Sequence, residues 1–286
     1  MKAELFVSPD GGSVGHLQNW LANSPSIKRL RRILLGGLPF PVLESDVRDV
    51  IYANWVVPVA AVADRVPPGV QLVERNGQTI LTVLTYAHGH FGPALAGPLR
   101  RFFPSPLQSN WRLYVEEVDG KAPAEDTVLF LANTFDSYLY ALGTRIFSDA
   151  MLSHRAEHFE HREQSDGWLT RLDGRGSAPS MTLHVGRLGQ AELPEAFAPF
   201  FSGLPDALRK LCLQHAALAP TERDGQLSLA GIDLPIRTDA VEFLRVVRYD
   251  PGALLKRWQA GNLPFCFRVP SVRFRAISER LVTTTM

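Results

Sequence analysis

The chain has 286 residues, of which 45% are hydrophobic and 21% charged, and its formal net charge at pH 7 is +1. This length is enough for one large domain with a sizeable core. The near-neutral charge argues against binding to nucleic acid or to an anionic membrane surface, because both partners require a basic excess. Lysine is scarce, so a mechanism that needs an amine has few candidates.

The two cysteines, Cys212 and Cys266, lie far apart in the sequence and outside any CxxC pattern. We therefore expect no disulfide framework and no structural zinc site, and we predict a cytoplasmic protein. The N-terminus lacks the long apolar segment of a signal peptide. No window approaches about 18 uninterrupted apolar residues, so no membrane partner is expected. No cofactor is predicted, and a homodimer is expected only because two-fold dimers are the commonest oligomers.

Residues 16–37 predict two short helices, because apolar residues recur at helical spacing on both sides of Pro25 and the Gly36–Gly37 pair ends the pattern. The second helix carries a run of basic side chains: Lys28, Arg29, Arg31 and Arg32. We interpret this run as the solvated face of an N-terminal helical extension, residues 1–44, that packs on the main domain. A helix that docks a partner is the alternative.

From residue 45 the chain becomes a series of short β-rich runs: 49–57, 70–74, 79–86, 111–117, 127–135, 168–172, 181–185, 241–247 and 266–270. Beside them stand five Asn-Gly or Asp-Gly pairs: Asn76–Gly77, Asp119–Gly120, Asp166–Gly167, Asp173–Gly174 and Asp224–Gly225. These pairs favour tight hairpins, because both residues tolerate positive φ.

The pattern predicts a mainly β, barrel-like fold in a single domain, residues 45–286, because closing an antiparallel sheet removes its exposed edges. Peripheral helices are predicted near 138–151, 205–217 and 251–259, in addition to the two short N-terminal ones.

Residues 108–117 form a strand whose two faces differ in chemistry. One face carries only polar or ionisable groups: Gln108, Asn110, Arg112, Tyr114 and Glu116. This face either lines a pocket or looks at water. In the second case Arg112 would pair with Glu116.

Two segments resemble a known family. The stretch 54–86 reads as a strand ending in Val-Pro, a short helix, a Pro-Pro-Gly turn and a hairpin, and 108–147 adds a strand of the form x-x-N-x-R-x-Y-V and a helix. Both resemble the uncharacterised bacterial YqjF-type family, whose fold is that of the acetoacetate decarboxylase superfamily. The resemblance implies a β-barrel-like cone with a small-molecule cavity, into which Gln108, Asn110, Arg112 and Tyr114 project.

The resemblance also indicates where catalysis would be sought. Acetoacetate decarboxylase uses a pair of adjacent lysines, one of which forms a Schiff base with a β-keto acid. The corresponding segment here, 141–154, contains Arg145 and no lysine, and an arginine stays protonated at neutral pH. Gln108 also stands where the family usually has glutamate. We therefore expect no imine chemistry.

The leading hypothesis is a barrel that binds a small carboxylate- or carbonyl-bearing molecule, an organic acid held by Arg112 with Arg145 as a second anion anchor. Catalytic residues are not identified. If the protein is an enzyme, we expect a lyase- or hydrolase-type reaction on a small organic acid without an imine intermediate.

Two alternatives stay open. One is a non-catalytic structural or assembly protein whose barrel is filled by side chains. The other is a metal-dependent enzyme that uses the cluster His154, His158 and His161, although this cluster lacks the compact HExxH pattern. The Gly/Pro-rich loop 87–98 is either a plain connection or a lid that carries His88 and His90 near a ligand.

Overall fold

The computed structural model describes residues 3–212 and 214–284. Its helices are α1 (Gly12–Asn23), α2 (Pro25–Leu35), α3 (Val59–Val62), α4 (Tyr138–Phe147), α5 (Leu204–Cys212) and α6 (Gly252–Arg257), with the 3-10 helices η1 (Ala63–Arg65), η2 (Ala94–Phe102), η3 (Glu195–Phe197) and η4 (Thr238–Ala240). Its strands are β1 (Leu43–Pro58), β2 (Val70–Leu72), β3 (Glu74–Arg75), β4 (Gln78–Ala87), β5 (Gly92–Pro93), β6 (Leu107–Val118), β7 (Thr127–Phe135), β8 (His154–Arg155), β9 (His158–Gln164), β10 (Gly167–Asp173), β11 (Met181–Leu188), β12 (Ala216–Pro220), β13 (Gln226–Asp233), β14 (Glu242–Asp250) and β15 (Phe265–Thr283).

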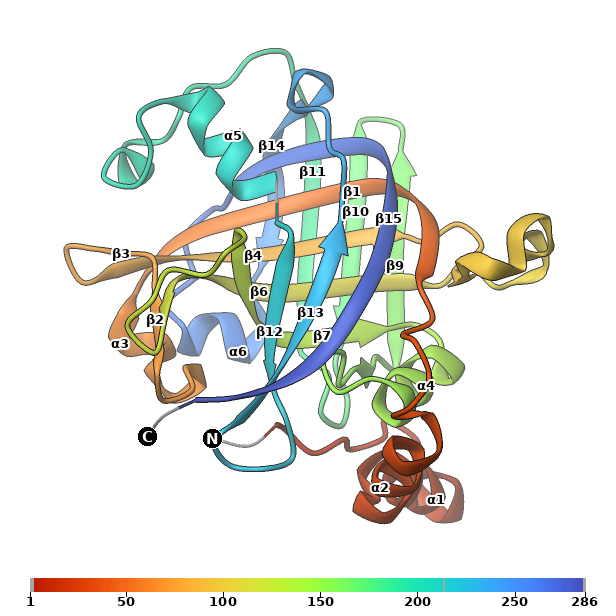
Figure 1. Ribbon diagram of the computed structural model, residues 1–286. Coiled ribbons are helices and arrows are strands. Elements are labelled where there is room, and N and C mark those ends of the chain that lie inside the picture. The colour runs from red at the N-terminus through yellow and green to blue at the C-terminus, as the bar shows by residue number, and fades with distance from the viewer. Residues whose placement is uncertain (1–2, 213, 285–286) are drawn as a thin grey trace.

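The strand pairings close on themselves. The ladder runs β1–β4–β6–β7–β12–β13–β15 and returns to β1, because the long strand β15 pairs with β1 on one side and with β13 on the other (Figure 1). From the first part of β15 a further set of strands extends, in the order β14, β11, β10 and β9. The mainly β fold with several helices is therefore confirmed.

Two of the five predicted pairs form tight turns with two consecutive positive φ values, whereas Asp173–Gly174 begins a longer loop between β10 and β11. Asn76 and Gly77 have φ of 54° and 75°, and Asp119 and Gly120 have φ of 50° and 73°. Two consecutive positive φ values are the requirement of a type I′ turn, which only residues such as Asn, Asp and Gly meet at low cost.

Alternation along the ring strands produces two cores. Trp111 and Leu113 of β6 point outward and belong to the same core as Trp168 of β10, and the Trp111 ring packs against the edge of Trp258. Tyr114 of the same strand points inward and packs with Tyr52 and other inward side chains of the ring. The apolar face of α5, which includes Leu208 and Leu211, belongs to this inner core. The apolar side of helix α5 therefore packs against the inward-facing side chains of the ring.

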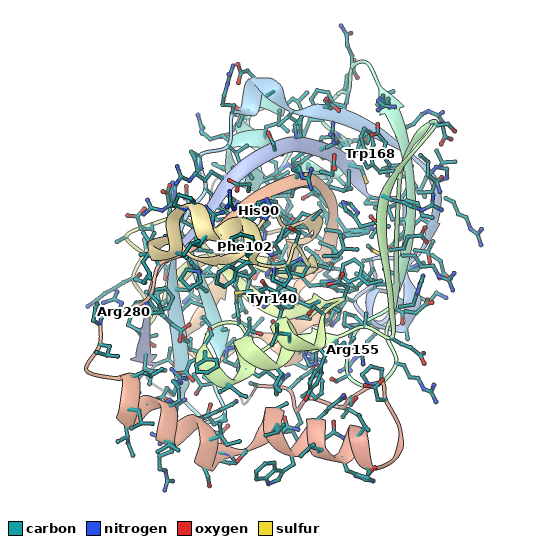
Figure 2. The ribbon with its side chains drawn as sticks, turned by 90° about the vertical axis from the view of Figure 1, so that its right-hand side faces the viewer. His90, Phe102, Tyr140, Arg155, Trp168 and Arg280 are labelled. Atoms are coloured by element: carbon teal, nitrogen blue, oxygen red, sulfur yellow. The ribbon has the colours of Figure 1, made fainter. Side chains whose placement is uncertain are left out.

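The N-terminal residues lie along the outside of the sheet. Helices α1 and α2 pack against α4, and they lie below it in Figure 2, where Tyr140 marks α4. Ahead of them, the Ala3 amide donates to the Thr221 carbonyl at 2.8 Å. The two predicted N-terminal helices are present, and α4, α5 and α6 match the three later ones, although each ends earlier than its predicted range.

Within the described part of the chain, no helix is both long and apolar enough to cross a membrane.

Candidate functional site

The polar face of β6 is buried inside the ring. Gln108, Asn110, Arg112 and Tyr114 are between 2% and 8% exposed. This follows from the pairing of β6 with β4 on one side and β7 on the other, which leaves the inward face enclosed. Glu116, near the end of the strand, is exposed and pairs with Arg75 at 3.2 Å. The alternative in which Arg112 pairs with Glu116 on a wet face is therefore wrong.

Arg112 is a buried cation without an acidic partner. Among residues 3–212 and 214–284, no carboxylate oxygen lies within 4.0 Å of its guanidinium nitrogens. Its Nη2 donates to the Leu211 carbonyl at 3.0 Å, and its Nε has no hydrogen-bond partner in the described structure. The rings of Tyr52 and Tyr114 lie 5.6 Å and 5.8 Å from its central carbon, close enough for cation–π attraction. A buried charge without a counter-ion is costly, so it needs an explanation.

Two other arginines show which groups bind the Nε–Nη2 edge of a guanidinium, the side that carries the Nε and Nη2 atoms. Arg32 uses Nε and Nη2 to hold Asp149, at 3.2 Å and 2.8 Å. Arg268 uses the same two atoms to hold Asp49, at 3.0 Å and 2.6 Å. In Arg112 the corresponding edge meets one carbonyl oxygen at Nη2 and nothing at Nε. This edge is half satisfied, and a carboxylate would satisfy it fully.

Neutral polar groups surround Arg112. The hydroxyls of Tyr114 and Thr82 lie 3.0 Å apart, and Thr82 donates to the Asn54 side chain at 2.7 Å. The Tyr52 hydroxyl and Asn110 Oδ1 are buried and have no hydrogen-bond partner among the described residues. Burial raises the pKa of Tyr52 and of Tyr114, so both phenols are protonated at neutral pH.

The end of α5 closes this region. The Leu211 carbonyl accepts from Arg112, from the Tyr114 hydroxyl at 3.2 Å and from Gln214 Nε2 at 2.6 Å. The neighbouring Cys212 is buried, and burial raises the pKa of its thiol to about 12 despite the charge of Arg112. The thiol is therefore protonated at neutral pH and is not a ready nucleophile.

A chain of hydrogen bonds continues from Gln108 into the ring. His88 Nε2 lies 2.7 Å from Gln108 Oε1, and His88 Nδ1 lies 2.8 Å from the Ser45 hydroxyl. Because an amide oxygen only accepts, Nε2 carries the imidazole proton. Burial lowers the pKa of His88 to about 4, so the ring is neutral at pH 7. On the other side of Gln108, Asn110 Nδ2 donates to Asn133 Oδ1 at 2.6 Å.

Arg145, the predicted second anion anchor, has partners of its own. It lies on α4, is 1% exposed, and donates to the carbonyls of Ser153, Glu4 and Leu152 at 2.6, 3.0 and 3.3 Å. Its guanidinium packs on the Phe6 ring at 5.4 Å. None of the residues that Arg145 contacts here also contacts Arg112. Arg145 therefore connects α4 to the N-terminal segment through hydrogen bonds and has a structural role.

The three histidines of the metal hypothesis do not converge. His154 Nδ1 contacts Ser177 Oγ at 2.6 Å, whereas His161 is held by Thr170 and by the Asp49 carbonyl, both at 2.8 Å. His158 is exposed on β9, three residues before His161 and hence on the opposite face. No group of three His, Cys, Asp or Glu side chains arranged for a metal ion occurs among the described residues.

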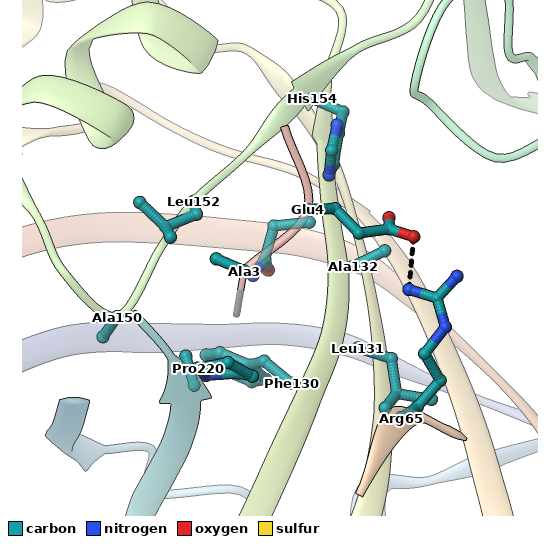
Figure 3. A pocket seen from close by; sticks show the side chains of 12 residues that line it. Ala3, Glu4, Arg65, Phe130, Leu131, Ala132, Ala150, Leu152, His154 and Pro220 are labelled. Atoms are coloured by element: carbon teal, nitrogen blue, oxygen red, sulfur yellow. Dashed lines mark ion pairs between the residues drawn. The ribbon is translucent and has the colours of Figure 1, made fainter. Parts of the chain in front are cut away.

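Two hollows in the structure lie away from Arg112. One, of about 50 Å³, is lined by His154, Leu152 and Ala132 and by Glu4, which forms an ion pair with Arg65 (Figure 3). It is far smaller than the roughly 300–1,000 Å³ of a typical ligand pocket. The other, of about 580 Å³, is an open hollow between β1, β15 and residues 235–240.

Sequence reasoning missed two residues of the Arg112 surroundings. Tyr52 lies on the inward face of β1, and its position on that face was readable from the two-residue period. Leu211 contributes only a backbone carbonyl, for which no side-chain pattern exists. His88 was expected in a loop. It does lie in the loop that follows β4, but its ring is fully buried and stacked on Phe91 with ring centres 4.2 Å apart.

Comparison with protein families decides the assignment. Residues 44–200 match the profile of DUF2071, described as an uncharacterized conserved protein. The chain belongs to the DUF2071 family. No curated protein matches the chain.

Solved structures with the same fold carry the acetoacetate decarboxylase name. The acetoacetate decarboxylase of Legionella pneumophila matches with a TM-score of 0.55 and 10% identity over 86% of this chain and 88% of that one. An acetoacetate decarboxylase-like enzyme of Sphingomonas wittichii matches at 0.50 and 10%, covering 86% and 95%. The enduracididine biosynthesis enzyme MppR, complexed with pyruvate, matches at 0.52 and 13%, covering 86% and 91%. This DUF2071 protein therefore has the acetoacetate decarboxylase-like fold that the sequence predicted.

Proposed function

We propose that this DUF2071 protein binds a small carboxylate-bearing molecule, such as a keto acid, inside the ring, with Arg112 as the anion anchor. The observation that carries the proposal is the half-satisfied edge of Arg112. Its Nη2 holds a neutral carbonyl and its Nε holds nothing, in a buried position where a lone charge is costly.

A carboxylate suits this edge in charge and in shape. It supplies two oxygens to two parallel N–H groups, as Asp149 does for Arg32. Asp49 satisfies the same two nitrogens of Arg268 with a single oxygen, Oδ1. The ligand oxygen would replace the Leu211 carbonyl, which keeps hydrogen bonds from Tyr114 or Gln214 as it moves. Asn110 Oδ1 and the Tyr52 hydroxyl, both without partners, would contact the rest of the ligand.

The comparison with MppR supports the ligand class. That protein has the same fold and was solved with pyruvate, which is a small keto acid. We extend this ligand class to the present chain because Arg112 supplies, inside the equivalent fold, the cation that a keto acid requires.

We further propose that no imine forms. Of the described lysines, Lys121, Lys210 and Lys256 are exposed, and Lys28 lies on α2 near Glu222 at 3.9 Å. None of the four belongs to the inner core around Tyr52 and Tyr114. The phenols and the Cys212 thiol are protonated at pH 7 and cannot act as bases. His88 is neutral, but both of its ring nitrogens are engaged by Ser45 and Gln108 and burial lowers its pKa to about 4, so it is a weak base.

Calorimetric titration with pyruvate and a panel of small keto and hydroxy acids tests the proposal. Wild-type protein should bind at least one member, and Arg112→Gln, which keeps a donor but removes the charge, should abolish that binding. Arg145→Gln is the matched control, because it also removes a buried arginine held by backbone carbonyls. It should retain binding wherever it folds.

Absence of any binding by wild-type protein would favour the alternative in which the interior is filled permanently by its own side chains. Equal binding by Arg112→Gln and wild type would show that the ligand sits elsewhere. Borohydride trapping with acetoacetate should give no covalent adduct, and an adduct on any lysine would contradict the claim against an imine.

A further inference from the structure

Helix α2 directs three of its four basic side chains toward the protein and most of its apolar side chains toward solvent, with Arg29 the exposed exception. Arg31 and Arg32 both bind Asp149, at 2.7 Å and 2.8 Å, on the inward side of the helix. The opposite side carries Leu30 and Ile33, which are 56% and 72% exposed. Surface helices of soluble proteins normally show the reverse orientation, with the apolar stripe toward the core. The basic run was expected to be solvated: Arg29 is exposed as expected, but Lys28, Arg31 and Arg32 face the protein and pair with Glu222 and Asp149, so for these three the interpretation is wrong.

Helix α1 has the same orientation. Gln18 and Asn19 point inward, where Gln18 Nε2 donates to Asp10 at 2.9 Å and Asn19 Oδ1 accepts from the Ser8 amide at 2.7 Å. The outward side includes Trp20, which is 61% exposed. Both N-terminal helices therefore expose apolar side chains and direct polar ones toward the protein. Polar contacts fix both helices on the protein and leave their apolar sides uncovered.

The uncovered surface extends over two further segments. Helix α4, on which α1 and α2 pack, exposes Leu139 and Phe147, and η2 exposes Leu95 and Phe102 at 85% and 72%. The Tyr140 hydroxyl joins α4 to the loop that carries η2, through the Phe91 carbonyl at 2.7 Å. Figure 2 shows η2 with Phe102, α4 with Tyr140 and the two N-terminal helices on the side that faces the viewer.

We name this surface the apolar face, defined as the exposed apolar side chains of residues 5–38, 95–103 and 139–147. It holds 16 of the 21 large apolar side chains that are exposed in the described structure. Each exposes on the order of 100 Å², so these side chains together expose on the order of 1,000 Å² or more, distributed over the three segments. The largest apolar patch on a typical monomer is about 300–600 Å².

We propose that the apolar face is the contact surface between two copies of this chain. A stable interface needs roughly 800 Å² from each partner, which the exposed apolar side chains of the three segments together exceed. A two-fold dimer places the same surface on both partners, so the exposed apolar side chains of one copy meet those of the other. An anionic lipid surface fits less well, because Asp149 neutralises Arg31 and Arg32 and leaves Arg29 and Arg101 as the exposed arginines of the described face, fewer than the basic cluster that such a surface attracts.

Sedimentation and light scattering of the full chain test this proposal. Wild-type protein should be a dimer at micromolar concentration. Ile33→Glu and Phe102→Glu each place a charge in the face without touching the core, and each should raise the dimer dissociation constant at least about tenfold. Leu263→Glu is the control, because Leu263 is 69% exposed but lies outside the face, and it should leave the dimer unchanged.

A monomeric wild-type protein would overturn the proposal, and so would a dimer that both Ile33→Glu and Phe102→Glu leave intact. A wild-type monomer that floats with neutral phosphatidylcholine vesicles would assign the face to lipid instead. Circular dichroism of each variant separates loss of the interface from loss of the fold. The result is independent of ligand binding, because Arg112 lies inside the ring.

Discussion

Arg112 Nη2 and the Leu211 carbonyl oxygen are 3.0 Å apart, across 99 residues of sequence. The contact joins the middle of β6 to the end of α5, inside the ring. A neutral oxygen therefore occupies one of the two positions that the carboxylates of Asp149 and Asp49 fill on Arg32 and Arg268. The interior of the ring holds a cation whose natural partner is absent from the described residues.

Replacing Arg112 by methionine should cost little stability. The substitution removes a buried charge without a carboxylate partner, and Leu211 keeps its hydrogen bonds from Tyr114 and Gln214. We expect the free energy of unfolding to change by no more than about 1 kcal/mol, in either direction, because apolar replacement of buried charges is often neutral or stabilising. Urea denaturation measures it. A loss of about 3 kcal/mol or more would identify Arg112 as a structural residue.

Arg145→Met should behave in the opposite way. This substitution leaves the carbonyls of Ser153, Leu152 and Glu4 without their donor in a buried region. We expect a loss of about 3 kcal/mol or more, because each unsatisfied buried group costs about 1–3 kcal/mol. The same urea titration compares the two arginines directly. Equal stabilities of the two methionine variants would refute the distinction between a site arginine and a structural one.

Because His88 is buried and neutral, the free energy of unfolding should decrease as the pH falls. Burial lowers the pKa of His88 in the folded protein to about 4, from 6.5. Between these values the unfolded chain binds more protons than the folded one, so stability is complete above pH 6.5 and falls as the pH drops toward 4. The full loss from this residue is about 3 kcal/mol.

His154 and His161 add to this loss in the same direction, because burial lowers their pKa as well. His88→Gln should therefore reduce the slope of stability against pH by about one proton without abolishing it. Thermal unfolding from pH 7 to pH 4 measures the difference. Identical slopes for wild type and variant would show that His88 does not titrate as its burial requires.

Gln108→Glu restores the acid that the YqjF-type pattern usually has at this position. The new carboxylate would lie beside His88 Nε2, where Gln108 Oε1 is now 2.7 Å away. An opposite charge at this distance should raise the pKa of His88 by one pH unit or more. The carbon-bound protons of the imidazole, followed by NMR against pH, report this pKa. An unchanged value would mean that the glutamate stays protonated in the ring.

Local patterns predicted much of the fold. The Asn76–Gly77 and Asp119–Gly120 pairs placed two of the hairpins, and the two-residue period of 108–117 separated the outward Trp111 from the inward Arg112. These features depend on neighbours in sequence.

The partners of the buried polar groups could not be predicted in this way. Arg112 meets Leu211 and Arg145 meets Glu4, across 99 and 141 residues. The basic run of α2 illustrates the same limit. Its spacing predicted a helix with a charged face, but only the position of Asp149, more than 100 residues later, turns that face inward.

The measurement that tests the central claim most directly is the arginine Nε–H spectrum of ¹⁵N-labelled protein during titration with pyruvate. The Arg112 signal is identified by its absence in Arg112→Met. Arg112 Nε has no partner in the described structure, so a bound carboxylate should move its signal downfield in a saturable manner. A signal that stays in place at saturating pyruvate, and at saturating levels of the other keto acids, would contradict the assignment of Arg112 as the anion anchor.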